Sequence, residues 1–411
     1  MLSKRGKAMN YTKQEVMQFV GEEDVKFIRL AFCDVFGKQK NISIMPEELE
    51  RAFEHGIAID ASAVKGFGSE AHSDLFLHPD PETLAALPWR PEHGRVVRMF
   101  CTVKYPDGSI FENDTRSILK KAVADAEKAG YEFRFGAEME FYLLKLDDYG
   151  DNVKVPYDNA GYMDIAPYDK SENIRREICI SLKDMGIYPE SSHHEEGPGQ
   201  NEIDFRYSDP LSAADNALTF RKIVQDIALH NGLWASFSPK PLEDKPGNGL
   251  HINMSVKSRN GEENISSSMI AGILEHVRDM TIVLNPKDES YKRLGSHKAP
   301  KYISWSSQNR SQLIRIPAAH GEYKRMELRS PDPRANPYLA FALLIYASLD
   351  GIQRKLTLPL PADTNLYTAD EAELSKYEKL PENRKEAAKI AENSEFMIKY
   401  LTDSMIETYC K

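Results

Sequence analysis

Apolar and polar residues alternate along four short stretches of the chain. In the first stretch, residues 133–143, the odd positions from Phe133 to Phe141 are apolar, whereas the even positions include Glu138 and Glu140. Because successive side chains of a β-strand point to opposite faces, this pattern predicts a strand with one apolar and one polar face. The same alternation recurs at residues 202–206, 250–256 and 325–329. Carboxylates, a histidine and arginines occupy the polar faces, which favours a metal and phosphate site over a plain solvent-exposed surface.

Helical patterns separate these strands. We predict helices at residues 115–129, from Ser171 to Met185, at 212–231 and from Asn336–Pro337 to Leu349, the last almost wholly apolar. Near the start of the chain, strands are expected at 25–32, 40–44 and 95–103, with a short helix at 46–55. The tail beyond residue 367 is charged and helical in pattern. The predicted class is α+β: a small sheet domain, then a larger domain with a curved, mostly antiparallel sheet backed by helices.

The length and composition limit the broad class of protein. A chain of 411 residues can bury a sizeable core and is expected to form two domains, 1–107 and 108–411, divided after a turn at residues 105–108. A net charge of −10 argues against a nucleic-acid partner. Four widely spaced cysteines form no CxxC pair and fit a reducing compartment. The basic start at residues 1–7 lacks a following apolar run, and nothing approaches the roughly 20 apolar residues of a membrane span. We therefore expect a cytoplasmic protein without a membrane partner.

Several acidic residues and one histidine occupy the polar positions of the predicted strands or lie beside them. The candidate metal ligands are Glu138, Glu140, Glu195, Glu202, His251 and Glu327. Bringing carboxylates together costs like-charge repulsion unless cations hold them. Oxygen ligands with one imidazole and no thiolate favour Mg²⁺ or Mn²⁺ over zinc. A single glutamate of this group, taken alone, is most simply interpreted as a solvated surface residue. The prediction therefore depends on the fact that these residues share the polar face of the predicted strands or lie beside it.

Five arginines follow within forty residues. They are Arg293, Arg310, Arg315, Arg325 and Arg329. A lone arginine usually forms a surface ion pair worth about 0–1 kcal/mol, but a group beside a candidate metal ligand indicates an anion pocket. The loop at residues 239–249, with Gly247 and Gly249, leads directly into His251 and suggests a close backbone approach to a substrate.

The pair His193–His194 before Glu195 lacks the His-Glu-x-x-His helical spacing, so a zinc protease is excluded. Adjacent side chains in an extended segment point opposite ways, and we expect at least one of these histidines to be structural.

Taken in order, these segments resemble the glutamine synthetase family of the bacterial type I kind. Residues 60–67 (D-A-S-A-V-K-G-F) are similar to the family's D-G-S-S-I-x-G-F, and 136–141 (G-A-E-M-E-F) to its G-P-E-P-E-F. Residues 192–205 match S-H-H-E…G-Q-H-E-I-D-F. Later segments match S-Y-K-R-L, W-S-x-Q-N-R-S-x-L-I-R-I-P and R-x-E-x-R-x-x-D-P-x-A-N-P-Y-L. The resemblance extends from about residue 25 to about residue 367.

The resemblance implies an ATP-dependent ligase of nitrogen metabolism. The enzyme would activate the γ-carboxylate of glutamate or an analogue as an acyl phosphate and form an amide with ammonia or an amine. A β-grasp N-terminal domain and a ring of subunits with shared active sites are also implied.

Residue roles carry over from the matching motifs. Glu140, Glu195 and Glu202 would hold one Mg²⁺ or Mn²⁺, and Glu138, His251 and Glu327 another. Arg293, Arg329, Gly247 and Gly249 would contact the acid, Arg310 and Arg315 the transferring phosphoryl group, and Ser255, Arg315 and Arg325 the nucleotide. Asp60 would come from the adjacent subunit.

Three departures from the family pattern bear on the substrate. Lys298, in G-S-H-K-A-P, stands where the family's G-Y-E-A-P has a glutamate that takes a proton from ammonium. Pro246 replaces an asparagine of the glutamate-binding loop, and the chain ends at Lys411, without the family's C-terminal segment between rings. We therefore keep open a γ-glutamyl ligase specific for an organic amine, and, in another class, an inactive homologue with a scaffold or regulatory role.

Overall fold

The computed structural model describes residues 11–68, 73–88, 94–262, 265–319, 321 and 324–411. The basic start of the chain therefore lies outside the described residues. The chain divides into two compact units, one of Met1–Ile118 with Cys179–Tyr188 and one of Leu119–Ile178 with Pro189–Lys411. The domain boundary after residue 107 stays a prediction. Within the described residues, no helix has the length and apolar character needed to cross a lipid bilayer.

The first unit is built on a six-stranded sheet in the order β2-β1-β6-β4-β3, with β5 on β6. Its strands are β1 (Val25–Cys33), β2 (Gln39–Ile44), β3 (Ile57–Asp60), β4 (Asp74–Pro79), β5 (Ala85–Ala86) and β6 (Arg95–Lys104). The β1–β2 hairpin was predicted, and Gly37 provides the positive φ of 71° in its turn. Helix α2 (Leu49–His55) packs on β4. Helix α1 (Lys13–Glu22), closed by a capping box of Thr12 and Glu15, was not predicted.

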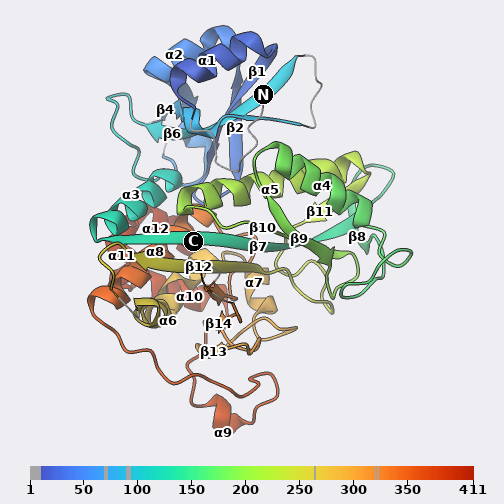
Figure 1. Ribbon diagram of the computed structural model, residues 1–411, viewed down its shortest axis with the longest axis vertical. Helices are drawn as coiled ribbons and strands as arrows, with labels where there is room; N and C mark the ends of the chain where they lie inside the picture. Colours follow the sequence, from blue (N-terminus) through green and yellow to red (C-terminus); the bar gives the residue numbers. More distant parts are fainter. Residues whose placement is uncertain (1–10, 69–72, 89–93, 263–264, 320, 322–323) are drawn as a thin grey trace. The chain divides into compact units, whose positions relative to one another are not determined.

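A nine-stranded sheet forms the framework of the second unit. Its order is β13-β14-β15-β12-β7-β10-β9, with β8 and β11 paired to β7. The strands are β7 (Tyr131–Leu146), β8 (Asn152–Pro156), β9 (Pro189–His194), β10 (Gln200–Phe205), β11 (Leu233–Ser236), β12 (Leu250–Ser258), β13 (Trp305–Ser307), β14 (Ile314–Ile316) and β15 (Met326–Leu328). Figure 1 shows the long strand β7 with β12 beside it. Apart from β13–β14, the pairs are antiparallel, as predicted.

The longer helices that follow the first sheet in the chain are α3 (Thr115–Lys128), α4 (Glu172–Asp184), α5 (Pro210–His230), α6 (Ile265–Leu284) and α8 (Pro337–Gln353). Of these, α5 contacts β7 and β11, and α6 contacts β12. The shorter ones are α7 (Asp288–Arg293), α9 (Glu371–Leu374), α10 (Arg384–Glu392), α11 (Glu395–Tyr400) and α12 (Asp403–Cys410). Helix α5 begins at Pro210 with Asp209 as its N-cap, so the predicted start at residue 212 was late. Sequence periodicity missed this start because it locates apolar positions better than caps.

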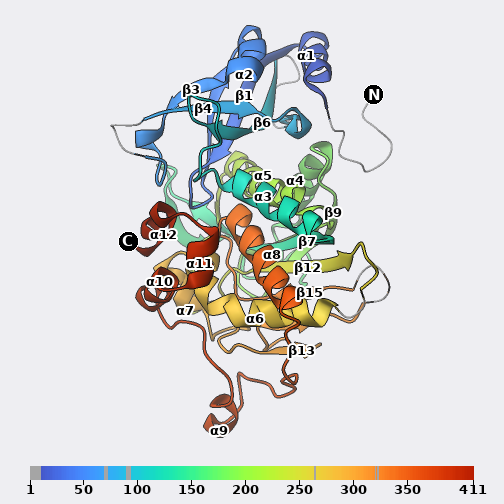
Figure 2. The same ribbon diagram turned by 90° about the vertical axis from the view of Figure 1, so that its left-hand side faces the viewer.

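The predicted alternation along β7 is confirmed by its contacts. Phe133, Phe135 and Phe141 are buried, and the ring of Phe135 stacks on Phe341 of α8 with centroids 4.5 Å apart. Helix α8 is buried along nearly its whole length, as its apolar sequence predicted. It packs against α6, as Figure 2 shows. The apolar face of the sheet is thus anchored to a rigid helical layer, and the opposite face is free to carry polar side chains.

Candidate active site

Strand register brings the predicted acidic residues together on the polar face of the sheet. In the β7–β12 pair Glu138 lies opposite His251, and in the β7–β10 pair Glu140 lies opposite Glu202. Strand β15 places Glu327 opposite Asn253 of β12. Directly opposed residues of antiparallel strands have Cβ atoms about 4.5–5.5 Å apart. Four strands distant in sequence therefore build one cluster.

The side chains of this cluster form overlapping groups of possible metal ligands. In the first group, His251 Nδ1 lies 3.6 Å from a carboxylate oxygen of Glu138 and 3.7 Å from one of Glu327. A second group joins Glu140, Glu202 and His251, with ligand atoms all within 4.8 Å of one another.

A third group lies at the β9–β10 end of the cluster. His193 approaches Glu195 at 3.7 Å and Glu202 at 3.5 Å. The predicted trio Glu140, Glu195 and Glu202 is thus distributed over two groups that share Glu202. His193 is an additional member. The available signal was that it precedes Glu195 by two positions in an extended segment, so that both side chains point to the same face. All six predicted ligands converge, and their roles as ligands stay predictions.

Crowding changes the proton affinity of these carboxylates. Burial and the neighbouring charge of Glu140 raise the pKa of Glu195 to about 7. Burial, followed by the charge of Glu138, raises the pKa of Asp204 to about 7. Burial acts to raise the pKa of Glu138 as well, but the hydrogen bond from His251 and its charge hold that pKa at about 2. Clustered carboxylates are suited to bind cations, and the oxygen and imidazole donors of this cluster fit Mg²⁺ or Mn²⁺.

Two arginines hold Glu327 at the buried end of the cluster. Its carboxylate is 1% exposed and accepts hydrogen bonds from Arg315 Nε at 2.5 Å and from Arg329 Nε at 3.3 Å. Arg325 Nε donates to the Asn253 side chain at 2.9 Å, and Asn253 in turn donates to Glu138 at 2.7 Å. The arginines therefore orient the carboxylates while keeping a dense positive charge beside them.

Arg293, Arg310 and Ser255 were also predicted to bind substrates, and they differ in burial. Arg293 is 3% exposed and donates to the carbonyl oxygens of Ser330 at 2.8 Å and Arg329 at 3.2 Å. Arg310 is exposed, and its carbonyl oxygen accepts a bond from Arg329. Ser255 is half-buried on β12, at the phase shared by His251 and Asn253.

Asp60 belongs to the first unit. Its carboxylate accepts hydrogen bonds from the amide of Ser62 at 2.9 Å and from the Ser62 hydroxyl at 2.6 Å, at the end of β3. It is exposed there. Its contribution to a neighbouring subunit stays a prediction.

The loop before β12 is packed so closely at Gly247 and Gly249 that larger residues would not fit there. A Cβ atom on Gly247 would lie 2.3 Å from the carbonyl oxygen of Pro239, and one on Gly249 would lie 2.8 Å from Arg293 Nη2. The amide of Gly249 donates to Glu140 at 2.7 Å. Gln200, which sequence reasoning missed, donates to the same carboxylate at 3.2 Å. The glycines allow the backbone itself to take part in the site.

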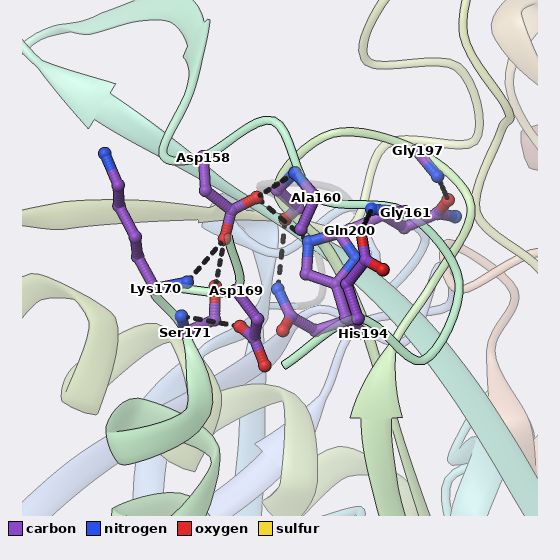
Figure 3. Close-up of polar contacts among 12 residues, drawn as sticks. Asp158, Ala160, Gly161, Asp169, Lys170, Ser171, His194, Gly197 and Gln200 are labelled. Carbon is purple, nitrogen blue, oxygen red and sulfur yellow. Dashed lines mark hydrogen bonds and ion pairs between the residues drawn. The ribbon is translucent and has the colours of Figure 1, made fainter. Parts of the chain in front are cut away.

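His194 points away from the cluster and is fully buried. Its Nε2 lies 2.9 Å from Asp158 Oδ1 (Figure 3). Its Nδ1 lies 2.7 Å from the carbonyl oxygen of Glu195. Burial acts to lower the pKa of His194, but the bonds to Asp158 and to the Glu195 carbonyl oxygen, with the charges of Asp158 and Asp169, together outweigh it and raise the pKa. Burial acts to raise the pKa of Asp158, but hydrogen bonds from His194 and the Lys170 amide lower it to about 2. The prediction that one of the two histidines is structural is confirmed by this pair.

Lys298 lies at the edge of the site, in a turn where His297 and Lys298 have φ angles of 45° and 66°. Its ammonium group forms an ion pair with Glu196 and lies 6.0 Å from the ring centroid of Tyr162. The carbonyl oxygen of Lys298 accepts a hydrogen bond from Arg329 at 3.2 Å. The turn is therefore coupled through Arg329 to the buried carboxylate cluster.

Comparisons with known proteins identify the family. Residues 24–106 match "Glutamine synthetase, beta-Grasp domain", and residues 112–411 match "Glutamine synthetase, catalytic domain". The chain belongs to the glutamine synthetase family. It is 42% identical to a "Glutamine synthetase" of Clostridium saccharobutylicum, over 97% of this chain and 93% of that protein. It is 43% identical to a "Glutamine synthetase" of Methanosarcina mazei, over 97% of this chain and 92% of that protein.

Solved structures agree with this assignment. A "GmaS/ADP complex" superimposes with a TM-score of 0.87 at 28% identity, covering 96% of this chain and 93% of that one. A Plasmodium falciparum glutamine synthetase has a TM-score of 0.85 at 23% identity, with 98% and 95% covered, and it supports the fold only. The predicted α+β architecture with a β-grasp N-terminal domain is confirmed. Glutamine synthetase family membership makes this protein an ATP- and divalent-metal-dependent ligase of nitrogen metabolism that uses glutamate and ammonia or an amine.

Proposed function

We propose that this ligase joins the γ-carboxylate of glutamate, or of a close analogue, to an organic amine in preference to ammonium. The observation that carries this choice is the ion pair of Lys298 with Glu196 beside the ring of Tyr162. An ammonium ion is attracted by a free carboxylate, whereas a lysine at the edge of the site repels it and pairs with the nearby carboxylate of Glu196. An alkyl amine can enter as the neutral base and place its carbon chain on Tyr162, which is 51% exposed.

Ammonia is the second candidate. The relatives that are about 40% identical over nearly the full chain are named glutamine synthetase, which favours it. The two candidates share the same first half-reaction and differ only in the nucleophile that completes it.

The residue roles that we propose follow the family resemblance, and the convergence of the six candidate ligands supports them. Glu140, Glu195 and Glu202 would hold one Mg²⁺ or Mn²⁺, and Glu138, His251 and Glu327 a second. Such ions would neutralise phosphate charge and lower the repulsion between two anionic substrates. Arg293 and Arg329, with the backbone at Gly247 and Gly249, would orient the acid. Arg310 and Arg315 would stabilise the transferring phosphoryl group, and Arg325 and Ser255 would contact the nucleotide.

Charge dictates how these side chains would act. A γ-carboxylate and the terminal phosphate of ATP repel each other, and arginines fixed by buried hydrogen bonds offer compensating charge without reorganising. Arg315 and Arg329 are held in this way by Glu327. Displacement of ADP by the carboxylate oxygen forms an acyl phosphate. Attack of the neutral amine then forms the amide and releases phosphate, with the amine proton passing to a base or to solvent.

The nucleophile can be identified by measuring ADP release with glutamate and Mg²⁺ against a panel containing ammonium, short alkyl amines and diamines. We expect one organic amine to saturate at a concentration at least about fivefold below ammonium, since a methylene group buried in a pocket contributes about 1 kcal/mol. Mass spectrometry of the amide product is the control against uncoupled hydrolysis. Efficient, saturable turnover with ammonium only would establish ammonia as the substrate.

We further propose a ring in which Asp60 completes a neighbour's active site, and a cytoplasmic location. The family resemblance supports both proposals. The fully or largely buried positions of Cys33 and Cys101 agree with thiols kept in a reducing compartment.

A further inference from the structure

The turn between β9 and β10 carries two residues of the proposed site, yet it is held from behind by residues outside that site. This turn, residues 195–199, contains Glu195 and the Lys298 partner Glu196, and it is closed by a hydrogen bond from the Glu195 amide to the Gln200 carbonyl at 2.8 Å. The Glu195 carboxylate is crowded, because its ligand atom lies within 4.8 Å of those of His193 and Glu202. A fixed backbone would keep the carboxylate in this position.

Asp158 and His194 grip both ends of the turn. His194 holds the Glu195 carbonyl oxygen at 2.7 Å, and Asp158 accepts the Gly199 amide at 2.9 Å. Asp158 Oδ1 also lies 2.9 Å from His194 Nε2, so that the contacts at the two ends of the turn are linked to each other. The side-chain atoms of both members are 0% exposed. Since a carbonyl and a carboxylate both only accept, His194 donates from both ring nitrogens and bridges them as a cation.

A second layer holds Asp158 and the far end of the turn. Asp158 Oδ2 accepts from the Lys170 amide at 3.1 Å and from the Ser171 hydroxyl at 3.2 Å, at the start of α4. The Gly199 carbonyl oxygen accepts from the Asn201 side chain at 3.0 Å. Asn201 in turn accepts from Arg175 at 2.6 Å. Figure 3 shows Asp158, Lys170, Ser171 and His194 converging behind the turn.

We propose that the Asp158–His194 pair is a positioning device that aims Glu195 toward His193 and Glu202, so that it sets the affinity of that group for a divalent cation without touching the ion. This inference relies on the proposed metal-binding role of Glu195. His193 then faces the cluster, whereas His194 holds the backbone of Glu195. Outer residues that orient a metal ligand typically change metal affinity by about 10–100-fold when mutated.

The test measures binding of Mn²⁺ to the intact, nucleotide-free protein by the electron paramagnetic resonance signal of the free ion. His194→Gln keeps a donor near the Nε2 position and loses the grip on Glu195, whereas His194→Asn keeps a donor near Nδ1 and loses Asp158. We expect one class of Mn²⁺ sites to weaken at least about tenfold in His194→Gln, with less effect in His194→Asn, while the remaining class keeps its affinity. Asp158→Asn is the alternative variant if either histidine replacement does not fold.

The matched control is His276→Gln. His276 pairs with Asp350 at 2.8 Å through the same kind of contact, but it lies between α6 and α8. It should lower the melting temperature without changing Mn²⁺ affinity. Unchanged Mn²⁺ affinity in the folded His194 variants, with weakened binding in Glu195→Gln, would overturn the positioning device and leave the proposed metal site intact. If Glu195→Gln also binds Mn²⁺ as tightly as the unmodified protein, both the device and the proposed role of Glu195 are wrong.

Discussion

Three charged or titratable side chains surround the buried carboxylate of Glu327. It is buried, lies 3.7 Å from His251 and accepts hydrogen bonds from two arginines. Removing one partner of such a buried charged group leaves the others unpaired, which is more costly than the pair itself is stabilising. At the scale of single residues, function and stability are therefore linked at this position.

Replacing Glu327 by alanine should abolish turnover. We expect kcat to fall by at least about 10²–10³, because the residue acts on charge that develops during phosphoryl transfer. Steady-state kinetics with varied glutamate and ATP check this, with Glu327→Gln as the variant of conserved size. A loss confined to KM would show that Glu327 contributes only to ground-state binding.

Replacing Lys298 by glutamate should improve the use of ammonium. The change removes a cation and adds a carboxylate at the edge of the site, so we expect the KM for ammonium to fall by about tenfold. Lys298→Gln, which removes charge without reversing it, should lie between the two. An unchanged KM for ammonium in both variants would mean that residue 298 does not face the incoming nucleophile.

Helices α6 and α8 show how packing at the scale of elements supports the site. They approach so closely at Gly272 and Gly351 that a Cβ on Gly351 would lie 2.2 Å from the carbonyl oxygen of Ser268. The same pair of helices is tied by His276 and Asp350, and the ring of Phe396 from α11 stacks on His276 with centroids 4.1 Å apart. Phe341 of α8 also stacks on Phe135 of β7. The closely packed helices therefore support the strand that carries Glu138 and Glu140.

Gly351→Ala should destabilise the protein by about 1–3 kcal/mol, because backbone atoms on the facing helix cannot move aside cheaply. Chemical denaturation measures the change. Gly21→Ala in α1 is the matched control, since a Cβ there meets nothing within 4 Å; it should be neutral or stabilising by up to about 1 kcal/mol. Equal effects of the two changes would exclude close helix packing as the cause.

The His276–Asp350 pair should make stability depend on pH. Burial acts to lower the pKa of His276, but hydrogen bonds to Asp279 and Asp350 raise it overall. For Asp350 burial acts to raise the pKa, but His276 and Arg354 lower it overall. The histidine contribution is therefore present below its unfolded pKa of about 6.5 and is lost as pH rises through the folded pKa, whereas the aspartate contribution is lost in acid below about pH 4.

His276→Gln should accordingly cost more stability near pH 5.5 than near pH 8.5, with a loss of about 1.5–3 kcal/mol at the lower pH. Urea denaturation of the variant and the unmodified protein at both pH values provides the comparison. A loss that is the same at both pH values would show that His276 is held as the neutral ring.

At the scale of the whole molecule, the proposed sharing of Asp60 can be separated from a role inside one chain. Asp60→Ala and Glu327→Ala subunits should each be inactive. If each site takes Asp60 from its neighbour, subunits dissociated and reassembled as an equal mixture should recover about a quarter of the activity, because about a quarter of the sites then contain both groups. Light scattering of the reassembled sample verifies that rings have formed. No recovery in a fully reassembled sample would contradict the shared site.

Many of the elements, and the inventory of chemical groups, could be predicted from the amino-acid sequence, although helix α1 was missed. Period-two alternation identified the strands around Glu138 and His251, because local periodicity records which face is hidden from water. The almost wholly apolar run of residues 337–349 identified the buried helix. The glutamate, histidine and arginine composition of the polar faces indicated cation and anion binding before any contact was known.

Tertiary structure alone decided which of these groups meet. Strand register places His251 opposite Glu138 and Glu202 opposite Glu140, and register depends on pairings between residues more than fifty positions apart. His193 contacts Glu202, whereas His194 contacts Asp158. These contacts, and that of Lys298 with Glu196, likewise depend on segments that only folding brings together. Local patterns carry the direction of a side chain relative to its own strand, but they carry no information on its partner across space.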